Sequence, residues 1–484
     1  MTKIILNGRE VEADPDKPLI HACHEEGVEV PHYCYHPGLT PEGSCRICQV
    51  EITEGDRPPR VVASCRTPVT EGMVVNTEAP AAHDTRRECL EFLLKNHPLD
   101  CPICDKAGEC TLQDYSFAEG QTKGETAEPR RKLEKRKDLG DVILLDQERC
   151  ILCTRCVRFQ EEVTKKPELT NAGLASKTVI TTFGDRPLTG NYQGNLADIC
   201  PVGALTLKEF RFQARVWNLE KAPSVCGECS RGCAISVEVL RRDAVKRVRP
   251  LYDPGVNTWW MCDTGRFSFE YLNDAERLTG GLVAQGDSLL GVTASEAIAH
   301  AGGVLSGGGA AVVLGTPWLT REEAAALAGL ADALGARKAY VSPADNELKD
   351  DLLHTGDPAP NRRGLDEAGW EALPAAEAAE AVAGADRAVL AGERVLALLG
   401  DEPLGTTPLV TLDTHACLAA GVEACLAAPY HVEKTGTWVN VDGIERHLTV
   451  ARQAPAGVDP LEDTLARLTD ALSTPSEAAQ GAGA

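Results

Sequence analysis

Residues 150–156 read Cys-Ile-Leu-Cys-Thr-Arg-Cys, three cysteines at intervals of three in a chain of 484 residues. In two-cluster iron–sulfur proteins the motif C-x2-C-x2-C-x3-C-P occurs twice, and the fourth Cys of each copy ligates the other cluster. In the copy that begins at Cys150, the fourth position holds Gln160. A second copy ends at Cys200-Pro201, but its three earlier cysteine positions hold Gly190, Gln193 and Leu196. The first copy therefore keeps three ligands, Cys150, Cys153 and Cys156, and the second copy keeps only its fourth Cys, Cys200, which ligates the cluster of the first copy. Together they are enough for one [4Fe–4S] cluster.

Four cysteines closer to the N-terminus form a second group with the spacing C-x10-C-x2-C-x16-C: Cys34, Cys45, Cys48 and Cys65. A close C-x2-C pair with one Cys before it and one well after it is the general arrangement of a [2Fe–2S] site, although the first gap is longer than in the plant-type pattern. A zinc ribbon is the alternative. Zinc ribbons usually have two C-x2-C knuckles, and only one is present here.

The segments around this second group predict a small sheet. Asn7-Gly8 separates two short strand-like runs, and both residues tolerate the positive φ of a tight hairpin turn. A helical stretch over residues 18–26 is closed by Gly27. Further strand-like runs are Gln49–Ile52, Arg60–Ser64 and Met73–Asn76. A hairpin, a helix and more strands around a cysteine-bearing loop predict a β-grasp domain.

A third group follows a predicted helix over residues 83–96, on which Leu90, Leu93 and Leu94 share one face. The group is one imidazole and three thiolates: His97, Cys101, Cys104 and Cys110. Zinc also takes such a set, so spacing alone leaves zinc and an iron–sulfur cluster open. With iron, the neutral imidazole would replace an anionic thiolate and raise the reduction potential relative to a site of four thiolates.

A fourth group has the spacing C-x2-C-x3-C-x28-C and consists of Cys226, Cys229, Cys233 and Cys262. It is another set of four thiolates, for which zinc is again the alternative. The cysteines outside the four groups stand in apolar or helical contexts, and we expect them to pack as small hydrophobes in the core: Cys23, Cys89, Cys417 and Cys425.

Composition excludes several classes of protein. Of the 19 cysteines, 17 lie at or before Cys262, and an odd number in a chain of this size does not suit a disulfide scaffold. The chain has 49 Lys and Arg against 72 Asp and Glu, a net charge of −23, which argues against nucleic acid or anionic lipid as a partner. It lacks a long apolar run and the features of a signal peptide, so we expect neither a membrane span nor export by that route.

The composition changes near residue 273 to an Ala- and Gly-rich region. Short apolar runs predict strands at Ala310–Leu314, Ala339–Val341, Ala388–Leu390 and Leu409–Leu412. Thr320 and Glu323 form a capping box before the helical run Glu322–Leu334. Strands alternating with helices predict an α/β layer with a mostly parallel sheet, and the last residues, 473–484, are expected to be disordered. No dinucleotide-binding or P-loop glycine motif is present, so the chemistry is expected to be one-electron transfer.

The four groups, in this order, resemble those of the G-subunit family of bacterial NADH-quinone oxidoreductase, complex I. The segments that carry the resemblance are Pro31–Glu51, His97–Asp105, Cys150–Cys156 with Cys200, and Cys226–Cys262. The resemblance implies one [2Fe–2S] cluster and three [4Fe–4S] clusters. It also implies a peripheral-arm subunit that relays electrons from a flavin- and NADH-binding subunit towards quinone. The chain would have no substrate site of its own and would lie on the cytoplasmic side of the bacterial inner membrane, held there through the complex.

With the resemblance, the sequence predicts an α+β multidomain chain. Its expected parts are a [2Fe–2S] β-grasp domain (1–78), a His/Cys3 [4Fe–4S] domain (79–119), a degenerate bacterial-ferredoxin-like [4Fe–4S] domain (120–217), a molybdopterin-oxidoreductase-type [4Fe–4S] domain (218–272), a truncated α/β molybdopterin-oxidoreductase-like region (273–472) and the tail. The resemblance also implies that the cluster at the Cys226 site lies off the main electron route.

The final region is similar to molybdopterin oxidoreductases at Glu433–Gly443. Catalytic members of that group often have a Lys shortly after the last cluster cysteine, where this chain has Thr264. We therefore expect no molybdenum cofactor. Two alternatives remain: an iron–sulfur or catalytic subunit of an NAD-linked formate dehydrogenase or hydrogenase, and a zinc scaffold without redox chemistry.

Overall fold

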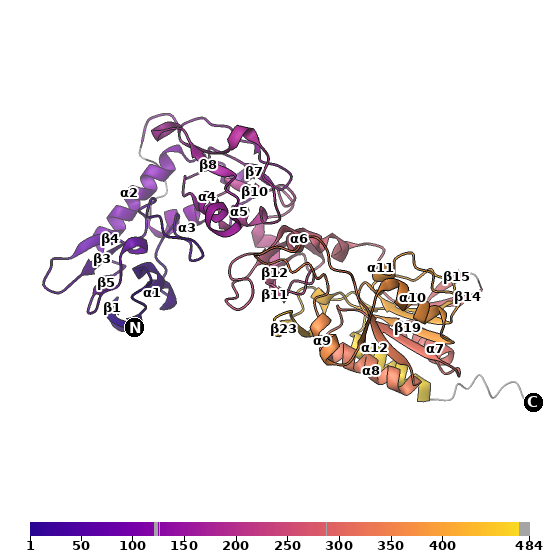
Figure 1. Cartoon of the computed structure of the whole chain (residues 1–484). Coiled ribbons are helices and arrows are strands. Elements are labelled where there is room, and N and C mark those ends of the chain that lie inside the picture. The colour runs from indigo at the N-terminus through magenta and orange to yellow at the C-terminus, as the bar shows by residue number, and fades with distance from the viewer. Residues whose placement is uncertain (121–123, 125, 287, 474–484) are drawn as a thin grey trace, which may run out of the picture. The chain divides into compact units, whose positions relative to one another are not determined.

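The computed structural model describes residues 1–120, 124, 126–286 and 288–473, which fall into two compact units, Met1–Asn218 and the chain from Leu219 onward (Figure 1). The expected disorder over residues 473–484 is wrong for Ser473, which ends a helix, and otherwise lies outside the described residues. Within the described part, no helix is both long enough and apolar enough to cross a membrane.

The first unit opens with a five-stranded sheet in the order β2-β1-β5-β3-β4. The strands are β1 (Thr2–Leu6), β2 (Arg9–Ala13), β3 (Gln49–Thr53), β4 (Arg60–Ala63) and β5 (Val74–Asn76). Asn7 and Gly8 take the expected positive φ values of 48° and 83°. Helix α1 (Leu19–Glu25) buries Leu19 and Ile20 in a core shared with alternate residues of the strands. The predicted hairpin, helix and strands are all confirmed.

Helix α2 (Pro80–Asn96) begins three residues before its predicted start, because Pro80 occupies the first helical position, where its missing N–H costs nothing. The predicted apolar face is only partly right: Leu90 is buried, but Leu93 and Leu94 are half-buried. Arg86 is buried instead, and its guanidinium donates to the backbone oxygens of Gln49 and Thr77 and to Glu119. Polar anchoring of α2 replaces the apolar contact that the spacing predicts.

The rest of the first unit consists of short elements joined by long loops. Strand β7 (Ile143–Leu145) lies between β6 (Lys137–Asp138) and β10 (Leu205–Leu207), and β8 (Leu169–Ala172) pairs with β9 (Val179–Thr182). The α-helices are α3 (Thr111–Ala118), α4 (Arg155–Phe159), which continues as a π-helix over Gln160–Thr164, and α5 (Gly194–Ile199). Single 3-10 turns span Ser64–Arg66, Cys101–Ile103, Ala175–Lys177, Phe183–Asp185 and Val216–Asn218.

The second unit begins with an antiparallel sheet of β11 (Leu219–Val225), β12 (Ala234–Leu240) and β13 (Ala244–Pro250), followed by α6 (Asp263–Phe267) and a 3-10 helix over Ser268–Asn273. A second antiparallel pair, β22 (Gly436–Val439) with β23 (Glu445–Leu448), follows the 3-10 turn His431–Glu433 near the end of the chain.

An eight-stranded sheet forms the rest of the second unit, in the order β15-β14-β21-β20-β19-β16-β17-β18. Its strands are β14 (Gly281–Gln285), β15 (Ser288–Val292), β16 (Ala311–Gly315), β17 (Arg337–Val341), β18 (Glu371–Leu373), β19 (Arg387–Ala391), β20 (Leu409–Asp413) and β21 (Val422–Ala427). The six strands from β21 to β18 are parallel, and β14 and β15 are antiparallel. The predicted strands and the mostly parallel α/β layer are confirmed.

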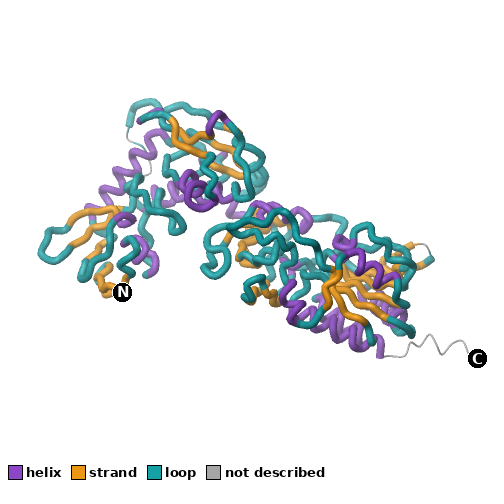
Figure 2. Tube along the Cα trace, in the orientation of Figure 1, coloured by secondary structure: helices purple, strands orange, loops and turns teal. Residues whose placement is uncertain are grey.

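Helices cover both faces of this sheet. Figure 2 shows the strands of the sheet lying between the helices. On one face, α7 (Ala294–Leu305), α8 (Arg321–Leu334) and α12 (Leu461–Ser473) share a core with Val313 and Val389. On the other, α10 (Ala375–Ala383) and α11 (Val395–Leu399) pack on Val312 and Ala388. The short helix α9 (Arg362–Glu367) precedes β18. The predicted capping box is confirmed, since the Thr320 hydroxyl and the Glu323 carboxylate each accept from the other residue's backbone N–H.

Candidate iron–sulfur sites

The first group along the chain lies at the edge of the N-terminal sheet. Cys34, Cys45 and Cys48 come from the loop between α1 and β3, and Cys65 comes from the 3-10 turn after β4. The Cys34 backbone N–H donates to Cys45 Sγ at 3.4 Å. The Ser64 N–H and hydroxyl both donate to the Cys48 carbonyl at 2.9 Å, which ties the two segments together. The structure therefore brings all four predicted residues of this group together.

Hydrogen bonds join the thiols of this group. Hydrogen bonds from Cys45 and Cys65 lower the pKa of the Cys34 thiol, and the bond with Cys65 lowers the pKa of Cys48 to about 7. The same bonds, together with burial, raise the pKa values of the Cys45 and Cys65 thiols. Thiols held this closely share one site, and a bound metal would replace their protons.

The group of His97 and three cysteines begins at the end of α2. His97 is the residue that caps this helix at its C-terminus, Cys101 begins a 3-10 turn that Cys104 directly follows, and Cys110 directly precedes α3. Burial lowers the pKa of His97 to about 4, so its imidazole is neutral near pH 7. Its Nδ1 atom is buried without a hydrogen-bond partner among the described residues. A neutral imidazole with an unused ring nitrogen is what a metal requires of a histidine.

Gly203 approaches a ligand of the His97 group more closely than any side chain would allow. A Cβ atom added there would lie 2.1 Å from Cys104 Sγ. The Thr111 N–H and hydroxyl both donate to the Pro201 carbonyl, at 3.2 and 3.1 Å. The loop that carries Cys200 therefore packs directly against the His97 group, a contact that sequence reasoning missed because the two segments lie about ninety residues apart.

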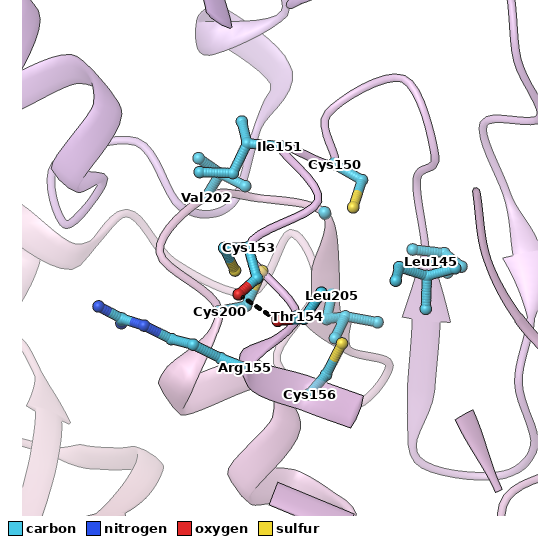
Figure 3. A pocket seen from close by; sticks show the side chains of 12 residues that line it. Leu145, Cys150, Ile151, Cys153, Thr154, Arg155, Cys156, Cys200, Val202 and Leu205 are labelled. Atoms are coloured by element: carbon cyan, nitrogen blue, oxygen red, sulfur yellow. Dashed lines mark hydrogen bonds between the residues drawn. The ribbon is translucent and has the colours of Figure 1, made fainter. Parts of the chain in front are cut away.

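The group around Cys150 comes together in the first unit, at a cavity with apolar walls. Figure 3 shows the sulfur atoms of Cys150, Cys153, Cys156 and Cys200 facing a common space. The empty volume is about 360 Å³, part of it open to solvent, and its apolar lining includes Leu145, Ile180, Val202 and Leu205. Burial raises the pKa of Cys150 to about 12 and that of Cys153 to about 11. A pocket with apolar walls and four thiols fits a [4Fe–4S] cluster.

The Cys226 group lies in the second unit, where all four of its cysteines are buried. Cys226 follows β11, its N–H donates to the Cys233 carbonyl at 2.9 Å, and Cys262 Sγ caps α6 by accepting from the Gly265 N–H at 3.3 Å. A Cβ atom added to Gly265 would lie 2.8 Å from Cys226 Sγ. The adjoining cavity, about 290 Å³ with some open solvent, is lined in part by apolar side chains, Phe269 among them.

No three His, Cys, Asp or Glu side chains within the described ranges converge closely enough to hold a single metal ion. An iron–sulfur cluster does not require such convergence, because its ligands bind different iron atoms. All nineteen cysteines lie in the described part of the chain, and each is free of disulfides. Cys23, Cys417 and Cys425 are buried in apolar cores, as expected, whereas Cys89 is only half-buried, with Sγ 3.4 Å from the Arg46 carbonyl.

The ligand loops of the first unit contact each other directly. Helix α4 follows Cys153 and contacts the loop after Cys34: Arg158 donates to the carbonyls of Cys34 and Thr40, and the Thr40 N–H donates to Glu162 at 2.7 Å. Together with the contact of Gly203 with Cys104, these bonds place the group around Cys150 beside both of the others in this unit.

Family models match four successive stretches of the chain. Residues 1–80 match a 2Fe-2S iron-sulfur cluster binding domain, and residues 86–124 match the NADH-ubiquinone oxidoreductase-G iron-sulfur binding region. Residues 140–206 match the ferredoxin-like domain of NADH-quinone oxidoreductase subunit 3, and residues 219–274 match the molybdopterin oxidoreductase Fe4S4 domain. The predicted order of one [2Fe–2S] domain, [4Fe–4S] domains and a molybdopterin-oxidoreductase-type domain is confirmed.

Curated relatives match more than half of the chain. The G subunit of the NADH-quinone oxidoreductase of Streptomyces coelicolor is 41% identical over 64% of this chain and 38% of the relative. The corresponding G subunit of Mycobacterium bovis is 37% identical over the same shares. The mitochondrial 78 kDa subunit of NADH-ubiquinone oxidoreductase from Neurospora crassa is 42% identical over 58% of this chain and 37% of the relative. The matched part of the chain thus spans about two fifths of the length of these relatives.

Among solved structures, an NAD⁺-reducing [NiFe]-hydrogenase in its H2-reduced state is 30% identical, covering 44% of this chain and 91% of the other, with a TM-score of 0.40.

Proposed function

The cluster-binding part of this chain is that of the NADH-quinone oxidoreductase G-subunit family, and from this premise we propose that the chain carries electrons within such a complex. It would accept them from an NADH-oxidising flavoprotein subunit and pass them towards quinone. The clusters supply one-electron chemistry when bound, and the protein supplies their ligands, their spacing and their exclusion from water. Identity of 37–42% over 58–64% of this chain supports this assignment.

The proposal assigns sixteen ligands to four clusters. The [2Fe–2S] cluster takes Cys34, Cys45, Cys48 and Cys65, in a domain of β-grasp type. The three [4Fe–4S] clusters take His97, Cys101, Cys104 and Cys110; Cys150, Cys153, Cys156 and Cys200; and Cys226, Cys229, Cys233 and Cys262. The thiol hydrogen bonds, the Nδ1 atom of His97, which has no hydrogen-bond partner among the described residues, and the apolar cavity around Cys150 support these sets.

One observation supports the proposed function more than any other: three ligand groups lie within one compact unit, and their ligand loops contact one another. The loop that holds Cys200 packs on Cys104 through Gly203, and the helix after Cys153 donates hydrogen bonds to the Cys34 loop. A chain that stored metal for structural reasons alone would not need its sites to adjoin. Adjoining sites are what electron transfer through a protein requires.

Partners and location follow from the same proposal. The flavin- and NADH-binding subunit and other peripheral-arm subunits would contact the chain, which would lie on the cytoplasmic side of the bacterial inner membrane through these partners. The eight-stranded sheet would serve as a scaffold without a molybdenum cofactor. This agrees with Thr264, which stands where catalytic molybdopterin enzymes often have a Lys.

The test is reduction of the clusters by a physiological donor. The full chain, reconstituted with iron and sulfide under anaerobic conditions, is mixed with the flavoprotein subunit and NADH and frozen for electron paramagnetic resonance. We expect signals from the clusters of the first unit with NADH, and loss of one of them in Cys150→Ser. Cys417→Ser, which alters a buried cysteine outside the four groups, should retain every signal. Reduction by formate or hydrogen with no response to NADH would contradict the proposal.

A further inference from the structure

Helix α4 places two arginine side chains between the [2Fe–2S] group and the group around Cys150. Arg155 and Arg158 are only 8% and 9% exposed. The Arg155 guanidinium donates from Nη1 to the Ile199 carbonyl, at 3.1 Å, and from Nη2 to the Tyr35 carbonyl. Ile199 directly precedes Cys200, and Tyr35 directly follows Cys34. One side chain therefore holds the ligand loops of two different groups.

Arg158 repeats the arrangement one turn along the helix. Its Nη2 atom donates to the carbonyl of Cys34, in the [2Fe–2S] group, and to the carbonyl of Cys153, at 3.3 Å, in the other group. Its Nη1 atom donates to the Thr40 carbonyl at 2.6 Å. The Glu42 carboxylate lies 3.8 Å from Nε and offsets part of this charge.

Arg155 differs in its counter-charge. Among the described residues no carboxylate lies within ion-pair distance of it, and its guanidinium instead contacts the carbonyls of Ile199 and Tyr35, each next to a cluster ligand in the sequence. In Figure 3 its side chain leads away from the cavity that the thiols enclose. By contrast Arg149, beside Cys104, has Asp100 at 3.1 Å and Asp146 at 3.2 Å. Arginine stays charged in proteins, and a buried charge requires compensation. For Arg155 that compensation comes from the two groups of ligands.

We propose that Arg155 and Arg158 are a shared counter-cation of these two cluster sites and raise the reduction potentials of both clusters. The proposal rests on the proposed function and adds two positioning residues to it. Each reduction adds one electron and so one negative charge to a cluster. A buried cation nearby favours the reduced form, because little solvent screens the attraction. Net charge around a cluster is one of the factors that set its potential.

The experiment is a dithionite titration of the full reconstituted chain, followed by electron paramagnetic resonance, in wild type, Arg155→Gln, Arg155→Lys and Arg158→Gln. In Arg155→Gln we expect the reduction equilibrium constants of both clusters to fall about tenfold, which is about 59 mV for one electron. Arg155→Lys retains the charge and should retain most of both potentials. Unchanged potentials in Arg155→Gln, or equal shifts in Arg155→Lys, would overturn the proposal.

Two further measurements keep the test decisive. Arg136→Gln removes one exposed positive charge from the same unit, where water screens it, and should leave both potentials unchanged. Should Arg155→Gln lose either cluster by iron analysis, Arg158→Gln carries the test. It should lower the reduction equilibrium constants of both clusters by less than tenfold, since Glu42 already offsets its charge, and unchanged potentials would overturn the proposal. Dithionite reduces the clusters without any partner, so failure of NADH to reduce the chain would count against the proposed function alone.

Discussion

At the scale of single residues, the ligand positions depend on backbone that has no side chain in the way. Gly203→Ala would place a Cβ atom 2.1 Å from Cys104 Sγ, on a backbone segment fixed by the bonds of Thr111 to Pro201. We expect this variant to lose the cluster at the His97 site, about four iron atoms per chain, while the other signals persist. Iron analysis and electron paramagnetic resonance of the purified variant check the result.

Gly291→Ala is the matched control, because nothing lies within 4 Å of an added Cβ atom at that position and its backbone is not left-handed. Full iron content in Gly203→Ala would show that Cys104 is not a ligand or that the loop yields without cost.

His97 offers a second residue-scale prediction. His97→Cys supplies an anionic ligand in place of a neutral one, so the cluster should still assemble, with a lower midpoint potential. His97→Ala should lose the cluster or its stability to air. A redox titration distinguishes the variants, and a midpoint in His97→Cys equal to or above the wild-type value would refute imidazole ligation.

The ligands themselves could be predicted from spacing, because a cluster site leaves a fixed pattern of cysteines in the sequence. The roles of Gly203, Gly265 and Arg155 could not be predicted, because each contacts a ligand segment that lies tens of residues away and the cysteine spacing does not indicate that contact. A glycine or an arginine has many ordinary uses, and only the folded chain shows which use applies.

At the scale of elements, α8 shows how a local signal can miss a long-range contact. The capping box of Thr320 and Glu323 is present as predicted. Glu323 is also fully buried and accepts two hydrogen bonds from Lys434 Nζ, at 2.9 and 2.7 Å. Burial raises the pKa of the Glu323 carboxyl, and Lys434 opposes that effect. The helix start thus depends on a residue from the segment before β22.

Lys434→Met should therefore destabilise the second unit by about 3–5 kcal/mol, since it leaves a buried carboxylate without its partner. Chemical denaturation followed by circular dichroism measures the loss. Lys349→Met, at an exposed position of the same unit, should change the unfolding free energy by less than about 0.5 kcal/mol. A cost below about 1 kcal/mol for Lys434→Met would mean that Glu323 is neutral in the folded chain.

Elements with strong local signals can be predicted with bounds within a few residues, as for α1 and the strands β16, β17, β19 and β20. The face of α2 was predicted less well. The leucine spacing there is compatible with burial, but Arg86 makes the inward contacts through hydrogen bonds that hydrophobic periodicity cannot detect.

At the scale of the whole molecule, the chain divides between Asn218 and Leu219, so that three ligand groups fall in one unit and the Cys226 group falls in the other. Cys226 and Cys233 belong to the apolar core of the second unit, with Val237 and Val239. This placement suits a site that stabilises its unit without carrying the main electron flow.

Cys226→Ser should lower the unfolding free energy of the second unit by roughly 3 kcal/mol or more, because a core metal site is lost. NADH-to-quinone turnover of the assembled complex should remain largely intact. Denaturation of the chain and turnover of the complex are measured on the same variant. Normal assembly with turnover lost in proportion to electron flow would place this cluster on the main route.

The central claim, four filled iron–sulfur sites in an electron-carrying chain, is tested most directly by metal analysis. The full chain is purified anaerobically, and iron, zinc and molybdenum are determined together with protein. The account predicts about fourteen iron atoms per chain, from one [2Fe–2S] and three [4Fe–4S] clusters, with negligible zinc and molybdenum. Stoichiometric zinc in place of iron would make the groups structural, and stoichiometric molybdenum would make the second unit catalytic.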